Sequence, residues 1–233
     1  MDAWPQLSSL AAEVLETARA MNASGINRGT AGNVSVRYPA RCPDEPFSFL
    51  ITPTGMAYDA CTAQDMVRVG KDGNADGGAF TRNKPSSEWR FHHDIYAARP
   101  EAQAIVHTHS PFATSLACQQ QDVPAFHYMV ARFGGDSVRC AGYATFGTQA
   151  LSDAILVALK DRSACLMAHH GMVVFGRSLR QALDLAIELE TLSEQYWRVL
   201  QLGDAKLLPA DEMQRVIEKF ATYGQQKQPP ATS

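Results

Sequence analysis

Two short apolar runs that each end in histidines restrict the folds open to this chain. Ala104-Ile105-Val106 leads into His107-Thr108-His109, and Cys165-Leu166-Met167-Ala168 leads into His169-His170-Gly171. Such runs are typical of β-strands, and side chains at i and i+2 of a strand point to the same face. Both histidines of the first motif can therefore reach one metal ion, and an imidazole of the second motif would supply a third ligand. Three protein ligands leave one position open, as in catalytic rather than structural zinc sites.

The composition restricts the class of protein and its partners. A chain of 233 residues that is 45% apolar can bury the core of one domain. A net charge of −3 without a block of lysines or arginines argues against nucleic acid or an anionic membrane as the main partner. No apolar run is long enough to span a bilayer, and we expect no secretory signal, because the first residues show no basic segment followed by an apolar one. Five scattered cysteines without a C-x-x-C motif are typical of reduced thiols, so we expect a cytoplasmic protein.

Hydrophobic periodicity predicts helices alternating with short strands. Apolar residues recur at helical spacing over residues 7–21, 86–98, 151–159, 178–202 and 211–220, and Pro111 is placed to begin a further helix. Alternating patterns predict strands around Val34–Val36 and Phe47–Ile51, with a loop at Pro39–Pro46 and a turn at Lys71–Gly78. This mixture indicates an α/β or α+β sandwich with helices on the faces of one sheet. We expect one domain over residues 1–224 and a disordered tail over residues 225–233.

Three loop-like segments carry small polar residues suited to binding an anion. They are Gly29–Ser35, Thr52–Gly55 and Pro85–Glu88. Glycines allow a ligand to approach the backbone closely, and Asn33 and Ser35 add hydrogen-bond donors. Ser86 and Ser87 stand at the start of a predicted helix, where free N–H groups favour negative charge. Together the segments predict a phosphate pocket that needs no lysine, and Glu88 beside it is a candidate general base.

These motifs resemble those of the class II aldolase/adducin-head family. The resemblance rests on segments that stand in the same order through almost the whole chain, at residues 29–37, 51–55, 85–92, 107–109, 127–129, 143–148 and 169–171. Within the family, the chain is most similar to the L-fuculose-1-phosphate aldolase branch. The resemblance implies a single-domain three-layer α/β/α sandwich around a central mixed, largely antiparallel sheet. It also implies a homotetramer whose active sites lie at the interfaces between subunits.

The resemblance implies a role for individual residues. The implied ligands of one zinc ion per subunit are His107, His109 and His170, and Glu88 is implied as the acid/base that also contacts the metal in the empty site. Tyr128 is implied to enter the site of a neighbouring subunit and to assist proton transfer, and Phe146 to lie near the aldehyde side. The implied phosphate-binding residues are Gly32, Asn33, Thr54, Gly55, Ser86 and Ser87. Three imidazoles also accept Mn²⁺, Co²⁺ or Ni²⁺.

The implied activity is retro-aldol cleavage of a ketose 1-phosphate of the L-fuculose 1-phosphate type. The products would be dihydroxyacetone phosphate and an aldehyde, formed through a metal-bound enediolate whose charge the zinc stabilises. The same scaffold leaves other activities open: an aldolase for 5-deoxyribulose or methylthioribulose 1-phosphate, an L-ribulose-5-phosphate 4-epimerase, a methylthioribulose-1-phosphate dehydratase and a tetronate-phosphate decarboxylase. A non-catalytic adducin-like binding module is an alternative of a different class.

Four histidines lie outside the implied set of metal ligands, and one segment departs from the family pattern. His92 and His93 are interpreted as packing or surface residues, and His127 as structural. His169 is expected to point away from the metal if it lies on a strand beside His170. Arg132-Phe133 stands where the family pattern has small residues, and if these side chains line the aldehyde end, the preferred substrate differs from fuculose phosphate.

Overall fold

The chain folds around one seven-stranded sheet flanked by helices, in a computed structural model that describes residues 3–38, 47–74 and 83–222. The helices are α1 (Ala3–Ala23), α2 (Trp89–Ala98), α3 (Pro111–Cys118), α4 (Gln149–Ala158), α5 (Leu179–Gln201) and α6 (Ala210–Thr222). The strands are β1 (Asn33–Tyr38), β2 (Ser48–Ile51), β3 (Val67–Val69), β4 (Ala104–Thr108), β5 (Cys140–Ala141), β6 (Ala164–Met167) and β7 (Gly171–Gly176). Two short 3-10 helices are η1 (Ala63–Asp65) and η2 (Tyr128–Phe133).

The sheet is mixed and largely antiparallel, as predicted. Its strand order is β3-β2-β1-β4-β7-β6-β5, and the described strands pair antiparallel except for β5 and β6, which are parallel. The middle strand, β4, lies between β1 and β7, where His107 is opposite Asn33 on one side and Val173 on the other. The first histidine motif therefore ends the central strand of the sheet.

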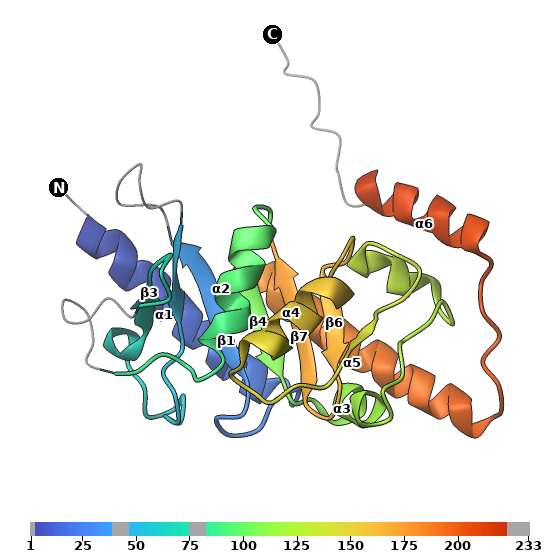
Figure 1. Cartoon of the computed structure of the whole chain (residues 1–233), viewed down its shortest axis with the longest axis horizontal. Helices are drawn as coiled ribbons and strands as arrows, with labels where there is room; N and C mark the ends of the chain where they lie inside the picture. Colours follow the sequence, from blue (N-terminus) through green and yellow to red (C-terminus); the bar gives the residue numbers. More distant parts are fainter. Residues whose placement is uncertain (1–2, 39–46, 75–82, 223–233) are drawn as a thin grey trace, which may run out of the picture.

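Helices cover both faces of the sheet and give the predicted three layers. Val34 and Val36 on β1 belong to a core that also contains apolar residues of α1, α3 and α5. Ile105 on β4 and Phe175 on β7 belong to the second core, which they share with α2 and α4. Figure 1 shows α2 and α4 on one side of the strands. Alternation along each strand thus divides its side chains between two cores.

The predicted helices are present, but α2 begins at Trp89 rather than at Ser86. The preceding residues pair with another loop instead of entering the helix. The N–H of Ser86 donates to the carbonyl oxygen of Thr52, and Pro53 and Pro85 form an isolated bridge. This pairing holds the serines before the helix and makes Glu88 its N-cap residue.

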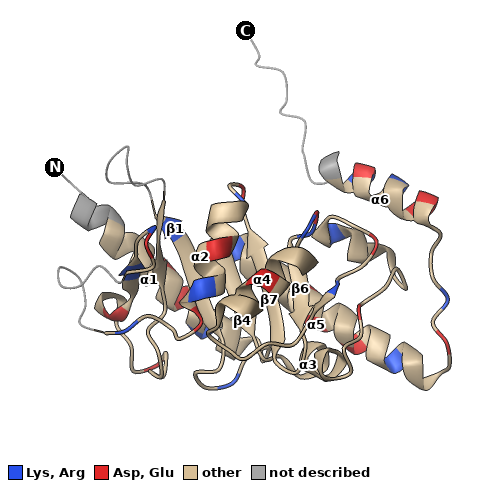
Figure 2. Cartoon of the chain, in the orientation of Figure 1, with Lys and Arg blue, Asp and Glu red and all other residues tan. Residues whose placement is uncertain are grey.

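Several predicted segments lie outside the described residues. These are the loop at 39–46, the second half of the turn at 71–78 and the tail at 225–233. Acidic and basic side chains are dispersed over the elements in Figure 2 rather than gathered on one of them, in keeping with the net charge of −3. Within the described ranges, every helix is too short or too polar to cross a bilayer.

Candidate metal centre

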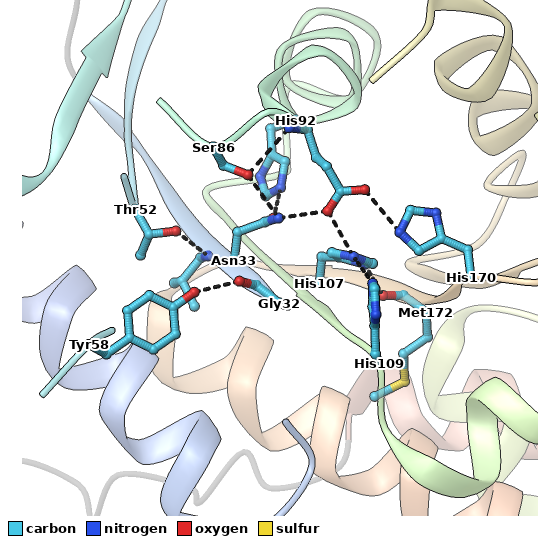
Figure 3. Close-up of polar contacts among 12 residues, drawn as sticks. Gly32, Asn33, Thr52, Tyr58, Ser86, His92, His107, His109, His170 and Met172 are labelled. Atoms are coloured by element: carbon cyan, nitrogen blue, oxygen red, sulfur yellow. Dashed lines mark hydrogen bonds and ion pairs between the residues drawn. The ribbon is translucent and has the colours of Figure 1, made fainter. Parts of the chain in front are cut away.

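Three imidazoles converge where β4 meets the turn between β6 and β7. His107 is the penultimate residue of β4, His109 follows two residues later, and His170 lies in the turn directly before β7. The ring centroids of the three histidines are 4.8 to 4.9 Å apart in each pair, with interplanar angles of 72° to 85°. Figure 3 shows the three rings turned toward one another. The i, i+2 spacing on the strand therefore places two ligands on one face, as the sequence predicted.

Glu88 completes the cluster from the start of α2. Its Oε2 lies 3.0 Å from Nε2 of His107, and its Oε1, which is buried and receives no hydrogen bond, lies 2.9 Å from Nε2 of His170. Burial would raise the pKa of Glu88, but the two adjacent imidazoles outweigh it and hold that pKa well below its usual range. The carboxylate is therefore ionised beside the imidazoles.

The chemistry of these four groups fits a divalent cation. One donor atom from each residue lies within 4.8 Å of every other. The Nδ1–H of His107 donates to the carbonyl oxygen of Met172 over 2.8 Å, which leaves Nε2 to face the cluster. Such a bond from the second ring nitrogen to a carbonyl is the usual way in which a metal-binding histidine is oriented. Three imidazole nitrogens and one carboxylate are a typical donor set for zinc, and they accept related transition metals.

Glycines allow the strand ends to approach closely enough for this convergence. A Cβ on Gly32 would lie 2.4 Å from the carbonyl oxygen of His107, and a Cβ on Gly171 would lie 2.3 Å from that of Thr108. The hydroxyl of Tyr58 donates to the carbonyl of Gly32 and fixes the turn before β1. Burial raises the pKa of Tyr58 to about 12, so the hydroxyl keeps its proton at neutral pH.

The predicted phosphate-binding segments lie side by side but differ in exposure. The N–H of Thr54 donates to the carbonyl of Lys84, beside the bridge that joins the second and third segments. Asn33 and Ser86 are buried, and the Nδ2 of Asn33 donates to Oγ of Ser86 over 3.1 Å. The exposed members of the predicted set are Thr54, Gly55 and Ser87. Ser35, expected to donate into the pocket, is instead fully buried under α2.

A cavity of about 300 Å³ opens beside the cluster. Its lining residues are Ala31, Ser87, Glu88, His109, Tyr143, Ala144, Phe146, His169 and His170. Phe146 was expected at the aldehyde side, and Tyr143 and Ala144 are additions that the same motif could have indicated. The side chains of Tyr143 and Phe146 are both 65% exposed and form an open aromatic wall of the cavity.

Tyr128 lies apart from this cavity. It begins η2, is half exposed, and stacks on Phe220 of α6 with ring planes 7° apart. His127 caps η2 by accepting a hydrogen bond from the N–H of Met129, which agrees with its interpretation as structural. A role for Tyr128 in catalysis therefore requires the site of another subunit.

Arg132 and Phe133, which depart from the family pattern, do not line the cavity of their own chain. Phe133 is fully buried in the core beneath α5, and Arg132 pairs with Glu188 over 3.1 Å. His169 adopts a left-handed backbone (φ 54°) in a turn rather than lying on a strand. Its ring is outside the donor cluster and contacts Gln120, although it reaches the cavity wall.

His92 lies close to the metal cluster, and its interpretation from the sequence as a packing or surface residue missed its contact with the site. It is fully buried, and its Nε2 lies 2.5 Å from Oδ1 of Asn33. Asn33 in turn donates to Oε2 of Glu88 over 2.9 Å. Two spacings in the sequence could have indicated this contact. His92 is four residues after Glu88 and so lies on the same helix face, and Asn33 is two residues from Ser35 and so lies on the same strand face.

The comparisons with known proteins agree with this geometry. A family model described as "Class II Aldolase and Adducin N-terminal domain" matches residues 12–197. The chain is 50% identical over 218 residues to a 5-methylthioribulose-1-phosphate/5-deoxyribulose-1-phosphate aldolase of Rhodospirillum rubrum, and 94% of each chain is covered. It is 42% identical over 218 residues to an L-fuculose phosphate aldolase of Escherichia coli K12, covering 93% of this chain and 96% of the relative. A solved structure of an L-fuculose 1-phosphate aldolase matches with a TM-score of 0.84 at 33% identity, covering 91% and 96% of the two chains.

Proposed function

The chain belongs to the class II aldolase and adducin N-terminal domain family, and from this membership we propose that it cleaves a 5-deoxy- or 5-methylthio-ribulose 1-phosphate. It is a class II aldolase that acts on phosphosugars. The proposed products are dihydroxyacetone phosphate and a small apolar aldehyde. The observation that carries this proposal is the donor cluster of Glu88, His107, His109 and His170 facing a cavity with an apolar aromatic wall.

A divalent cation held by the cluster, which we propose to be zinc, supplies Lewis-acid stabilisation of the negative charge that cleavage leaves on the carbonyl fragment. The chain's own residues bind the substrate and move protons. We assign the phosphate to Gly32, Asn33, Thr54, Gly55, Ser86 and Ser87, of which Ser87 reaches the cavity directly. Because Asn33 and Ser86 are buried and bonded to each other, they shape this pocket from beneath rather than forming its surface.

Proton transfer is assigned to Glu88 and Tyr128. Breaking the carbon–carbon bond requires loss of the proton from the hydroxyl beyond it and gain of a proton by the carbonyl fragment. We assign the first transfer to Tyr128 of a neighbouring subunit, acting as its phenolate, and the second to Glu88, whose ionised carboxylate first takes up a proton from water and then delivers it. Tyr128 lies outside the cavity of its own chain and is half exposed, which supports its contribution to the site of a neighbouring subunit in the homotetramer that we propose.

The aromatic wall favours an aldehyde that carries an apolar group. Tyr143 and Phe146 are exposed beside the donor cluster, where a methyl or methylthio group can bury area against them. The 50% identity to the methylthioribulose- and deoxyribulose-phosphate aldolase supports the same substrate class. L-fuculose 1-phosphate is the second candidate, supported by the 42% identity to a fuculose phosphate aldolase and by the structural match.

Release of dihydroxyacetone phosphate in a coupled assay tests the proposal. The panel contains 5-methylthioribulose, 5-deoxyribulose, L-fuculose and L-rhamnulose 1-phosphates, each with and without a chelator. We expect chelator-sensitive release with the highest kcat/KM for one of the two ribulose derivatives. A highest value for L-fuculose 1-phosphate would replace the proposed substrate with the second candidate. No release from any sugar by zinc-loaded protein would refute the proposed cleavage and favour epimerase, dehydratase or decarboxylase chemistry.

Phe146→Ala tests whether the aromatic wall selects the aldehyde. Loss of an apolar contact in a pocket typically costs about 1–3 kcal/mol, so kcat/KM for the methylthio substrate should fall about ten-fold or more relative to L-fuculose 1-phosphate. Val157→Ala is the matched control, because Val157 is an exposed apolar residue on α4 that does not line the cavity. An unchanged ratio of the kcat/KM values for the two substrates in Phe146→Ala would show that the aromatic wall does not select the aldehyde.

A further inference from the structure

A chain of buried polar side chains leads from Tyr96 through the α2–β1 interface to Glu88. The hydroxyls of Tyr96 and Ser35 are 2.8 Å apart, and Oγ of Ser35 is 2.7 Å from Nδ1 of His92. Nε2 of His92 is 2.5 Å from Oδ1 of Asn33, whose Nδ2 is 2.9 Å from Oε2 of Glu88. Figure 3 shows the last part of this chain, with His92 and Asn33 beside the three imidazoles.

The carboxylate at one end fixes the direction of every hydrogen bond in the chain. An ionised carboxylate only accepts, so Asn33 must present its NH₂ group to Glu88. The second proton of that NH₂ group goes to Oγ of Ser86. Oδ1 of Asn33 is then the acceptor at the other end of the amide, and Nε2 of His92 must carry a proton to donate to it.

The remaining bonds follow from the neutral state of His92. Burial, together with the nearby His107, lowers the pKa of His92 to about 3, so the ring carries one proton at neutral pH. With that proton on Nε2, Nδ1 accepts from the hydroxyl of Ser35, and Ser35 accepts from the hydroxyl of Tyr96. The donors thus run in one direction, from Tyr96 to Glu88.

Burial makes this direction costly to reverse. Ser35 and His92 are fully buried, Tyr96 is 1% exposed and Asn33 is 3% exposed, so water does not reach them to replace a lost bond. A flipped amide would place Oδ1 against the carboxylate and leave a buried donor facing the proton of His92. Unsatisfied groups of this kind cost about as much as the hydrogen bonds they replace, or more.

We propose that His92 is a positioning residue for the reaction: by donating from Nε2 to Oδ1 of Asn33, it holds the Asn33 amide so that the amide orients the Glu88 carboxylate in the metal cluster. This inference rests on the proposed function for its kinetic consequence. His92 touches neither the cavity nor the donor cluster, so it acts through Asn33. Its effect should therefore fall on kcat rather than on KM.

Two substitutions separate the two ring nitrogens of His92. Glutamine places an amide near the position of Nε2 and can still donate to Asn33, whereas asparagine reaches only the position of Nδ1 and leaves Oδ1 of Asn33 unpaired. We expect His92→Asn to lower kcat about ten-fold or more with KM within about three-fold. We expect His92→Gln to keep kcat within about three-fold. His93→Asn is the matched control, because His93 bonds Asp94 and the carbonyl of Lys71 instead.

A second measurement needs no substrate. In protein labelled with ¹⁵N-histidine, the resonance of His92 should report a neutral ring protonated on Nε2, with the protein either zinc-loaded or metal-free. Ser35→Ala removes the donor to Nδ1 but leaves the Asn33 acceptor of the Nε2 proton in place, so we expect the Nε2 tautomer to persist in that variant. Circular dichroism and thermal melting establish that each variant is folded, and equilibrium competition with a chelator gives its zinc affinity.

The outcomes decide the inference separately from the proposed function. Protonation of His92 on Nδ1 in the native protein would overturn it, as would equal losses of kcat in folded His92→Gln and His92→Asn. If the protein cleaves no ketose 1-phosphate, the proposed function is refuted. The tautomer of the His92 ring would still test the direction of the hydrogen bonds. An Nε2 proton together with a loss of kcat confined to the asparagine variant would support the positioning role.

Discussion

Gly171→Ala is expected to weaken metal binding while leaving the fold in place. Gly171 begins β7 directly after His170, and a Cβ added there would lie 2.3 Å from the carbonyl oxygen of Thr108 and 3.1 Å from Cδ2 of His109. Ordinary van der Waals contact begins at 3.4 Å. The ends of β4 and β7 must therefore separate by about 1 Å, because the nearest obstacle is backbone and cannot rotate away.

This separation acts directly on two of the metal donors. His109 follows β4 and His170 precedes β7, so moving the strand ends apart moves their ring nitrogens apart. Metal–ligand distances tolerate about 0.2 Å, so the expected movement is several times larger than the site accepts. We expect the zinc affinity to fall about 10–100-fold. Overpacking costs about 1–3 kcal/mol, which is less than the stability of about 5–15 kcal/mol of a typical domain.

Competition for Zn²⁺ against a chromophoric chelator measures this change, and circular dichroism with thermal melting establishes that the variant is folded. Gly142→Ala is the matched control, because a Cβ at Gly142 meets nothing within 4 Å and its affinity should equal that of the native protein. Native zinc affinity in folded Gly171→Ala protein would refute the reasoning that this close approach sets the spacing of the donors.

Further predictions concern turnover, assembly and acid stability. Glu88→Gln should retain zinc yet lose turnover about 100-fold or more, and unchanged turnover would remove Glu88 from proton transfer. Randomly mixed assemblies of Glu88→Gln and Tyr128→Phe chains should regain about a quarter of native activity if each site takes these residues from two subunits, whereas no recovery would place both in one subunit. Burial would raise the pKa of Asp94, but bonds from His93, Ser152 and Gln149 outweigh it and lower the pKa to about 2. Asp94→Asn should therefore destabilise the protein at pH 7 by about 1 kcal/mol, and the difference should shrink as the pH falls from about 4 toward 2, as urea unfolding can measure.

The sequence was sufficient to predict the layers and the metal cluster for physical reasons. Strand and helix periodicities are local, and they placed the predicted helices and the strands β1, β2, β4 and β6, but not the strands β3, β5 and β7. The i, i+2 spacing of His107 and His109 also fixes their relative direction within one strand. The position of His170 beside them depends on the antiparallel pairing of β4 with β7, which the resemblance to the family implied but the spacing alone did not.

Contacts between distant segments could not be read from local patterns. The start of α2 was predicted too early because the pairing of Ser86 with Thr52 holds the serines outside the helix. The interpretation of His92 as packing or surface was incomplete, because its partners Ser35 and Asn33 are more than fifty positions away. Each spacing was visible in the sequence, but only the packing of α2 on β1 shows that the two faces meet.

β1 presents valines to one core and hydrogen-bonding side chains to the other. A slip of one residue in its pairing with β4 would turn Asn33 and Ser35 toward α1 and α5, where the surrounding side chains are apolar. Each polar side chain buried there without a hydrogen-bond partner would lower the stability by about 1–3 kcal/mol. His92 would face a valine in place of Asn33 or Ser35. Asn33 and Ser35 thus favour the correct register of β1 over competing registers during folding. Substitutions that make β1 uniformly apolar should therefore increase the fraction of misfolded and aggregated protein, even where the correctly paired sheet tolerates them.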